Sequence, residues 1–365
     1  MKKIFIIIVL FFLSFSFAFA EENQILPAQT GIIQSVEYVD IENDIAQVKQ
    51  IVEIKIIEEN YKNQLIKVDN MLTGNPYYDI KLKPGMKVIL HVENSHDGLI
   101  YSIEDIKRSS VLLYLALIFC GLLVYVGRKK GINSLVSIAI TCLLITNFLS
   151  PMILRGINPV LSTILICLLS TAVTMYLVGG FNRKSTAATI GCMLSLIFAG
   201  VLSLLTVKIA HLTGFTGEHS LFLYSAHPEL NFVAITVSTM ILATLGAVMD
   251  VAMSIASTIN EIYTIDNSKK VKDLFVSGMN VGRDIIGTMA NTLILVYLGA
   301  SLPLLMLASN IDFQKFVNLN QVVTEIASAL IGSSAIVICV PITAIVASEL
   351  IKNMPQKIDF LSLND

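Results

Sequence analysis

Residues 186–208 read TAATIGCMLSLIFAGVLSLLTVK, and no charged side chain interrupts this stretch before Lys208. A helix rises about 1.5 Å per residue, so a stretch of this length crosses the roughly 30 Å of a bilayer's hydrocarbon core. The whole chain of 365 residues agrees, since 55% of it is hydrophobic and only 14% is charged. Because soluble proteins carry about a quarter charged residues, we predict an integral membrane protein.

Seven apolar segments predict seven membrane-spanning helices, at residues 111–127, 132–150, 159–180, 186–208, 231–250, 284–308 and 323–350. Eleven Lys and Arg residues lie in the first, third and fifth gaps and after the last segment, whereas the alternate gaps hold three. Basic residues accumulate on the cytoplasmic side of membrane proteins. The C-terminus is therefore predicted in the cytoplasm, and residues 21–108 outside.

The N-terminus resembles an export signal. Lys2 and Lys3 precede an apolar run, and the small residues Ala18 and Ala20 offer a cleavage site before residue 21. Residues 1–20 are thus predicted to be a signal peptide. The alternative is an uncleaved anchor helix, because residues 4–20 are nearly long enough to span the membrane. Either alternative places residues 21–108 outside, followed by a multi-span domain at 109–355 and a cytoplasmic tail at 356–365.

Residues 21–108 hold fifteen Asp and Glu and nine Lys and Arg, so they differ sharply from the apolar remainder. Apolar residues approach alternation over 47–56, which is typical of a strand with one buried face. Lys83-Pro84-Gly85-Met86 predicts a turn, and residues 87–92 and 99–103 predict two more strands. The predicted fold is an α-helical polytopic membrane protein of about seven spans, preceded by a small exported all-β domain built as a barrel or sandwich.

Enzymatic, metal and nucleic-acid functions find little support. A net charge of −2 gives no basic field for nucleic acid. The sequence lacks nucleophile-elbow, metalloprotease and phosphate-loop motifs, so we expect neither an enzyme nor a cofactor. All five Cys lie in the apolar part without zinc-like spacing, and the His residues are interpreted as surface or loop residues. No metal site is predicted.

The fifth predicted span carries polar residues along one helical face. Asp250, Ser254, Ser257 and Glu261 are spaced four, three and four residues apart, which places them on the same side of a helix. Two interpretations stay open. The stripe lines a cavity, or Asp250 marks the exit from the membrane and the helix continues to about residue 263 as an amphipathic cytoplasmic extension.

The sixth predicted span repeats the pattern. Asn280, Asp284 and Asn291 share one face, and the Gly278-xxx-Gly282 spacing would let another helix approach closely. The alternative is that Asp284 only marks a helix start. Glu325, near the outer end of the last span, is interpreted as a boundary residue.

Arg283 lies among these residues and needs a counter-charge if it enters the membrane. Adjacent residues point about 100° apart on a helix, so Arg283 cannot pair face to face with Asp284. We expect it to meet Asp250 or Glu261, because an unpaired buried charge is costly. The alternative is a positive-inside anchor at the membrane surface.

Two motifs carry a family resemblance: GAxxDVAxSIAS at residues 246–257 and SGMNxGRDIIGT at residues 277–288. With the stretch 291–299, they are similar to the signature segments of the YibE/F-like family of bacterial membrane proteins. A signal peptide followed by an exported β domain also suits that family. The resemblance implies a multi-pass protein of the bacterial cytoplasmic membrane and suggests a permease, but it supplies no substrate and no catalytic residue.

The leading prediction is a permease or secondary transporter of unknown substrate, with the two polar stripes lining a site between spans five and six. A carboxylate there would bind a proton or cation, and Arg283 would hold it in register. The alternative is a non-transporting membrane scaffold or sensor whose exported β domain binds a ligand or partner. Expected partners are the lipid bilayer and either further copies of the chain or a second membrane subunit, with no nucleic acid.

Overall fold

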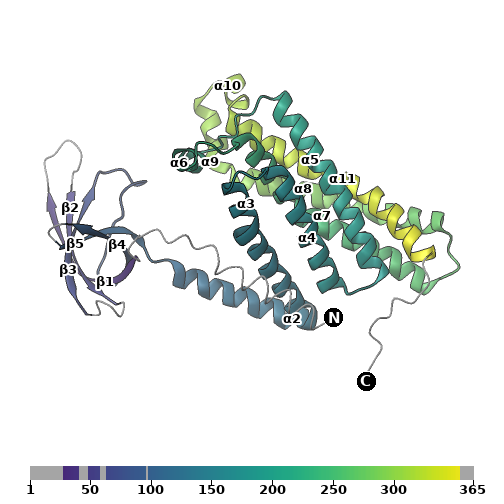
Figure 1. Ribbon diagram of the computed structural model, residues 1–365, viewed down its shortest axis with the longest axis horizontal. Coiled ribbons are helices and arrows are strands. Elements are labelled where there is room, and N and C mark those ends of the chain that lie inside the picture. The colour runs from purple at the N-terminus through teal and green to yellow at the C-terminus, as the bar shows by residue number, and fades with distance from the viewer. Residues whose placement is uncertain (1–27, 41–47, 58–62, 96–97, 354–365) are drawn as a thin grey trace. The chain divides into compact units, whose positions relative to one another are not determined.

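A computed structural model describes residues 28–40, 48–57, 63–95 and 98–353. The described residues form two compact units divided after Leu122, namely a β domain with the helical residues that follow it, and a helical bundle (Figure 1). The predicted signal peptide at 1–20 and the predicted tail at 356–365 lie outside the described residues.

The β domain is a single antiparallel sheet of five strands in the order β3-β2-β1-β4-β5. Its strands are β1 (Gln29–Asp40), β2 (Val48–Ile56), β3 (Leu65–Leu72), β4 (Lys87–Ser95) and β5 (Gly98–Ile106). The edge strands β3 and β5 also contact each other, which curls the sheet toward a barrel. This confirms the predicted all-β fold of the N-terminal domain.

Strand β2 supplies the centre of this domain's core. Val52, Ile54 and Ile56 are buried on one face, as their alternation predicts. Gln50 lies on the same face and is also fully buried. Its side-chain oxygen accepts a hydrogen bond from Asn70 Nδ2 at 2.9 Å, and its amide donates to the carbonyl of Leu82 at 3.3 Å. These bonds offset the cost of burying an amide.

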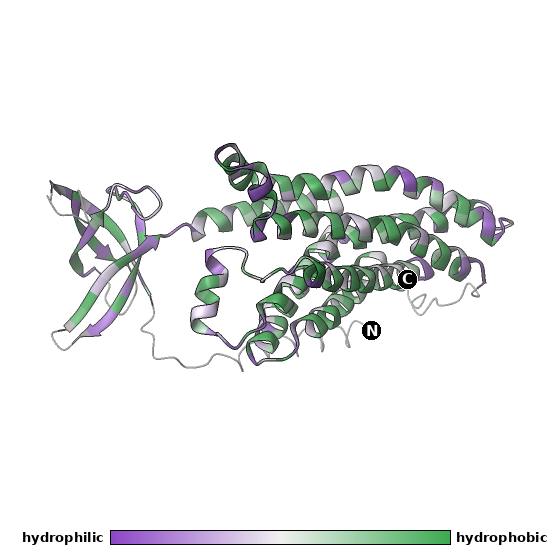
Figure 2. Cartoon of the chain, turned by 90° about the horizontal axis from the view of Figure 1, so that it is seen from above, coloured by the Kyte–Doolittle hydropathy of each residue, from purple (hydrophilic) through white to green (hydrophobic). Residues whose placement is uncertain are grey.

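The remaining described chain is helical. Its longer helices are α2 (Ser109–Leu144), α4 (Pro159–Gly179), α5 (Arg183–Ile209), α7 (Phe232–Ile265), α8 (Val271–Ala300) and α11 (Asn320–Asn353). Its shorter elements are η2 (Ile145–Leu149), α3 (Ser150–Leu154), α6 (Glu218–Ala226), α9 (Leu302–Leu307), η3 (Ala308–Asn310) and α10 (Phe313–Val317). Hydrophobic residues cover most of the length of the long helices (Figure 2).

In the described residues, six helical stretches are long and apolar enough to cross a membrane, rather than the seven predicted. The difference lies in the first stretch, Ser109–Leu154, which contains both of the first two predicted spans. Its backbone breaks at Arg128, where φ is 48° and ψ is −127°. The break coincides with the basic run of residues 128–130, so the predicted boundary exists as a kink within α2 and not as a loop.

The sixth span is displaced from its predicted bounds. It was expected at residues 284–308, but α8 begins at Val271 and ends at Ala300. Its start is polar, and Asp273 accepts a hydrogen bond from the backbone of Lys270 at 3.2 Å, which satisfies a free donor of the first turn. Pro303 follows in the short helix α9, which begins after Ser301. Apolar content alone therefore placed the span too late.

Small side chains bring α5, α7 and α11 close together in the bundle core. A Cβ at Gly191 of α5 would lie 2.9 Å from the Cβ of Thr343 on α11 and 3.1 Å from its Cα. Helix α8 joins through Gly278, where a Cβ would lie 2.6 Å from Ile259 Cδ1 of α7, and through Gly282, where a Cβ would overlap Val340 of α11. The predicted close approach at the two α8 glycines is thus present.

Basic segments far apart in the sequence meet at one end of the bundle. Arg183, at the start of α5, donates a hydrogen bond to the carbonyl of Ile351 near the end of α11 at 2.8 Å. Lys352 donates to the carbonyl of Asn267, in the turn between α7 and α8, at 3.0 Å. The predicted third and fifth gaps therefore share one end with the last residues of α11.

Candidate functional site

The polar stripe of α7 faces away from the bundle core. Asp250, Ser254 and Glu261 are exposed and Ser257 is half-buried. On the opposite side of the same helix, Val251, Ile255 and Ile259 are fully buried against the neighbouring helices. The helix runs unbroken to Ile265, so the predicted continuation beyond Asp250 is confirmed.

The polar stripe of α8 also faces outward. Asn280, Arg283, Asp284 and Asn291 are all exposed. The packed face of α8, which contains Leu274 and the two glycines Gly278 and Gly282, lies about half a helical turn away. Each stripe is therefore placed on one helical face as predicted, and both faces are left open by this bundle.

Arg283 does not form the expected ion pair with α7 in the described residues. Its guanidinium Nη1 donates instead to Asn280 Oδ1 on its own helix, at 3.1 Å. That bond is the one hydrogen bond between side chains of the eight predicted site residues in the described part of the chain. Both stripes thus face away from the bundle core, but no hydrogen bond or ion pair joins one stripe to the other in the described residues.

The core between the helices holds no charged side chain in the part of the chain that the structure describes. Its buried polar groups are hydroxyls of Ser and Thr. Many of them bond within their own helix, as Ser195 does to the carbonyl of Gly191 at 2.7 Å and Thr244 to that of Met240 at 2.7 Å. Such a core packs the helices together but provides no polar route through the bundle. Binding or movement of a charged species therefore has to involve the outer faces of the helices.

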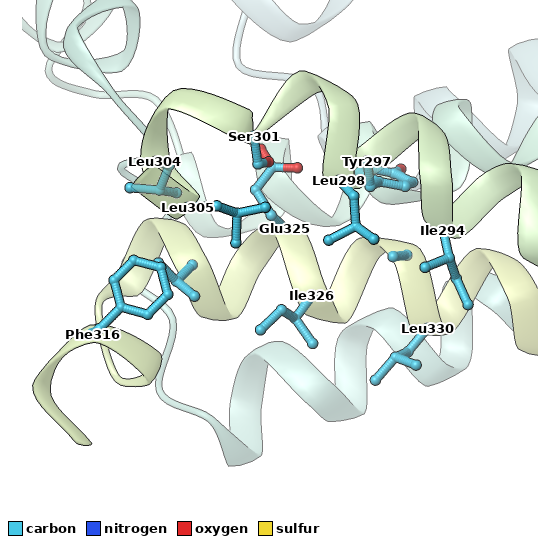
Figure 3. A pocket seen from close by; sticks show the side chains of 12 residues that line it. Ile294, Tyr297, Leu298, Ser301, Leu304, Leu305, Phe316, Glu325, Ile326 and Leu330 are labelled. Carbon is cyan, nitrogen blue, oxygen red and sulfur yellow. The ribbon is translucent and has the colours of Figure 1, made fainter. Parts of the chain in front are cut away.

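One acidic residue lies in a place that the sequence reasoning missed. Glu325 of α11 lines an apolar cavity beside Tyr297 of α8 and Ser301, the residue that follows α8 (Figure 3). Its position near the end of an apolar segment led to its interpretation as a boundary residue. The sequence did contain a signal for this position. Apolar residues lie on both sides of Glu325, from Val322 to Leu330, whereas a residue at the membrane surface would not need apolar neighbours on both sides.

Histidines and carboxylates do not gather into a metal site in the described residues. His91 lies 3.4 Å from Glu93, and His227 lies 3.2 Å from Glu229. Each is a pair of close sequence neighbours on an exposed surface.

Comparison with known proteins gives two family models that match consecutive parts of the chain. The model of the YibE/F family N-terminal domain matches residues 28–106, a range that contains all five strands of the β sheet. The model described as YibE/F-like protein matches residues 115–353, which include both polar stripes and the Glu325 cavity. No curated protein and no solved structure matches the chain. The two consecutive matches show that the chain belongs to the YibE/F-like family.

Proposed function

We propose that this protein is a permease, with no enzymatic activity, whose route follows the outward polar faces of α7 and α8. One observation carries the proposal: charged and amide side chains occupy the open face of α8 from Asn280 to Asn291, along about three helical turns of a membrane-length helix. Charged side chains within a span cost energy to insert and mark ion or substrate routes. An anchor helix has no use for them.

The chemistry assigned to the stripes follows from their residue types. Asp250 and Asp284 supply carboxylates that bind a proton or a cation. Arg283 is held by Asn280, which fixes its guanidinium on the same face. In this proposal the arginine positions the cargo or its counter-ion, and the carboxylates exchange the proton.

Proteoliposomes test this function with the proton itself as the probe. A pH-sensitive dye inside the vesicles reports proton entry under an imposed gradient. Asp250→Asn and Arg283→Gln should each slow entry about tenfold or more, because charge-assisted hydrogen bonds contribute about 1.5–3 kcal/mol. Glu349→Gln and Lys272→Gln, which remove exposed charges outside the stripes, should retain the flux of the unaltered protein.

If both stripe variants reach the membrane and conduct like the unaltered protein, the route is assigned to the wrong residues. If the unaltered protein conducts no faster than empty vesicles, proton-coupled transport itself is refuted.

The alternative function is a membrane scaffold or sensor that acts through the β domain. It is favoured by the core that this domain builds for itself around Val52, Ile54 and Leu90. Deleting residues 28–106 separates the two proposals. A permease should keep basal flux without the domain, whereas a sensor should lose its whole function.

We further propose that the protein lies in a bacterial cytoplasmic membrane with the β domain outside and the C-terminus inside. The meeting of basic segments at one end of the bundle supports this orientation. An epitope tag at the C-terminus should be inaccessible to antibody on intact cells and accessible after permeabilisation. A tag that is exposed on intact cells would reverse the topology.

A further inference from the structure

A half-enclosed cavity of about 160 Å³ lies at the end of the bundle opposite the basic segments. Its walls come from the last turns of α8, from α9 and α10, and from the first turns of α11 (Figure 3). Most of its lining is aliphatic or aromatic, including Ile294, Leu298, Leu305, Phe316, Ile326 and Leu330. Cavities of about 150 Å³ with such a lining bind benzene, so this one has room for a small apolar group.

A single carboxylate breaks this apolar lining. Glu325 points from α11 toward Ser301 at the end of α8 (Figure 3). The carboxylate accepts no hydrogen bond and forms no ion pair within the described residues, and no basic side chain lines the cavity. A half-buried anion without a counter-charge is costly, so the cavity is electrostatically incomplete.

The chemistry of the cavity walls favours an organic cation over a metal ion as the missing counter-charge. Calcium and magnesium require about six or more oxygen ligands, whereas this cavity offers one carboxylate, the hydroxyl of Ser301 and the phenol of Tyr297. An alkylammonium or arylammonium ion requires fewer. Its N–H groups can donate to Glu325 and Ser301, and its apolar body can fill the remaining volume.

We propose that the Glu325 cavity binds a small hydrophobic ammonium ion, with the nitrogen at the carboxylate and the apolar body among the aliphatic side chains. Tyr297 adds an aromatic ring beside Glu325, and aromatic rings attract cations. This inference names a class of substrate for the proposed permease. Binding at Glu325 does not depend on the proposed function, whereas transport of the bound cation does.

The position of the cavity suits that role. Arg283 and Ile294 lie about three turns apart on one side of α8, and Ser301, which follows the last residue of the helix, lies about two turns beyond Ile294 on the same side. The cavity and the α8 stripe therefore follow each other along the same helical face. A cation leaving Glu325 would next encounter Asn291 and then Asp284.

Covalent labelling of the full-length protein in phosphatidylcholine vesicles tests the binding. Dicyclohexylcarbodiimide is apolar, and a carboxyl oxygen adds to its central carbon with transfer of the carboxyl proton to nitrogen. Rearrangement then leaves a stable acylurea that peptide mass spectrometry locates. We expect an adduct at Glu325. Saturating N,N-dimethyl-2-phenylethylamine, a tertiary amine that keeps one N–H when protonated but cannot be converted to an amide by the activated carboxyl, should reduce the adduct about tenfold, as expected for a charge-assisted contact.

Matched controls separate charge from shape. The neutral alcohol 2-phenylethanol has the same body and should not protect Glu325. Glu325→Gln should abolish the adduct, while Glu325→Asp should keep both adduct and protection, which excludes a folding defect as the cause. Glu349 lies exposed on the same helix, and its labelling should be unaffected by the amine.

Three results would overturn the proposal: no adduct at Glu325, an adduct that the amine does not reduce, or equal protection by the alcohol. The labelling is repeated in vesicles that contain phosphatidylethanolamine, a lipid whose headgroup carries an ammonium group. If that lipid protects Glu325 while the free amine does not, the occupant is a headgroup and the proposed ligand is wrong. Binding without proton flux would refute the permease and leave the cavity assignment intact.

Discussion

A loop of the β domain is held by a single carboxylate. Asp79 accepts hydrogen bonds from the backbone of Thr73 at 2.6 Å, from the Thr73 hydroxyl at 2.9 Å and from the backbone of Gly74 at 2.8 Å. Desolvation raises the pKa of Asp79, but these bonds and the charge of Lys81 together outweigh it and leave the pKa below its usual value. The ionised form is therefore the one that stabilises the loop.

The lowered pKa predicts how acid affects the domain. A carboxyl group whose pKa is lower in the folded state stabilises the protein above its unfolded pKa, near 3.8, and that contribution is lost as pH falls through the folded value. Asp79→Asn should therefore lower the melting temperature at pH 7 and flatten its dependence on pH below about 4. Asp40→Asn, at the exposed end of β1, is the control. Equal pH profiles for the two variants would contradict this role.

At the residue scale, the sequence predicts residue types and helical faces but not pairings. Asp250, Asn280 and Asp284 lie on the faces that their spacing indicates. The partner of Arg283 could not be predicted, because it depends on how α7 and α8 are rotated about their axes. Glycine packing sets that rotation: Gly278 and Gly282 turn the α8 stripe away from α7.

Among the elements, α5 and α11 approach each other closely enough to constrain the bundle. Gly191 has Thr343 directly against it, and the Thr343 hydroxyl lies 3.5 Å from Cys339 Sγ. A methyl group added at Gly191 has no room unless Thr343 shifts. The two helices can therefore hold their spacing only with glycine at this point.

Gly191→Ala should destabilise the protein by about 1–3 kcal/mol, the usual cost of overpacking a core. Gly246→Ala is the matched control, because a Cβ there meets no atom within 4 Å and alanine favours helix by up to about 1 kcal/mol. Thermal unfolding of both variants in the same detergent measures the difference. A lower melting temperature for the Gly246 variant than for the Gly191 variant would refute this packing.

The sequence predicts the bounds of a helix or strand well where apolar content determines them. The bounds of α4, α5 and β2 lie within a few residues of prediction. The predicted start of α8 was wrong because the first turns of this helix are amphipathic and polar. Helix formation there depends on capping and on contacts with α7 and α11, which apolar content does not reveal. The kink at Arg128 was predicted as a loop, since the basic run gives the position of a break but not its geometry.

For the whole molecule, the outward stripes raise the question of what covers them in a membrane. Residues 109–127, the first part of α2, contain no charged side chain. They therefore offer no counter-charge to the charged residues of the stripes. We propose that a second copy of the chain supplies it, because Arg283 and Asp284 carry opposite charges at adjacent positions. In a two-fold arrangement, each arginine can meet the aspartate of the other copy. Gly287, with no atom within 4 Å of an added Cβ, leaves space for that approach.

A charge exchange tests the proposed dimer. Arg283→Asp and Asp284→Arg should each reduce dimer formation about tenfold or more, because each places like charges opposite one another. The double variant should restore it, because the pairs are re-formed with the signs reversed. Native mass spectrometry from lipid nanodiscs measures the dimer fraction. Lys272→Asp should have no effect, and a double variant weaker than both single variants would contradict the arrangement.

The polarity of α8 also has a consequence for how the chain is made. Among the described membrane-length helices it is the least hydrophobic, and little of its apolar stretch is buried. Such a segment partitions poorly into lipid by itself, whereas α11 is strongly apolar and packs along it. We therefore expect that, during biosynthesis, the insertion machinery retains α8 until α11 has emerged from the ribosome. A chain that stops after residue 300 should leave α8 outside the bilayer and exposed to quality-control proteases.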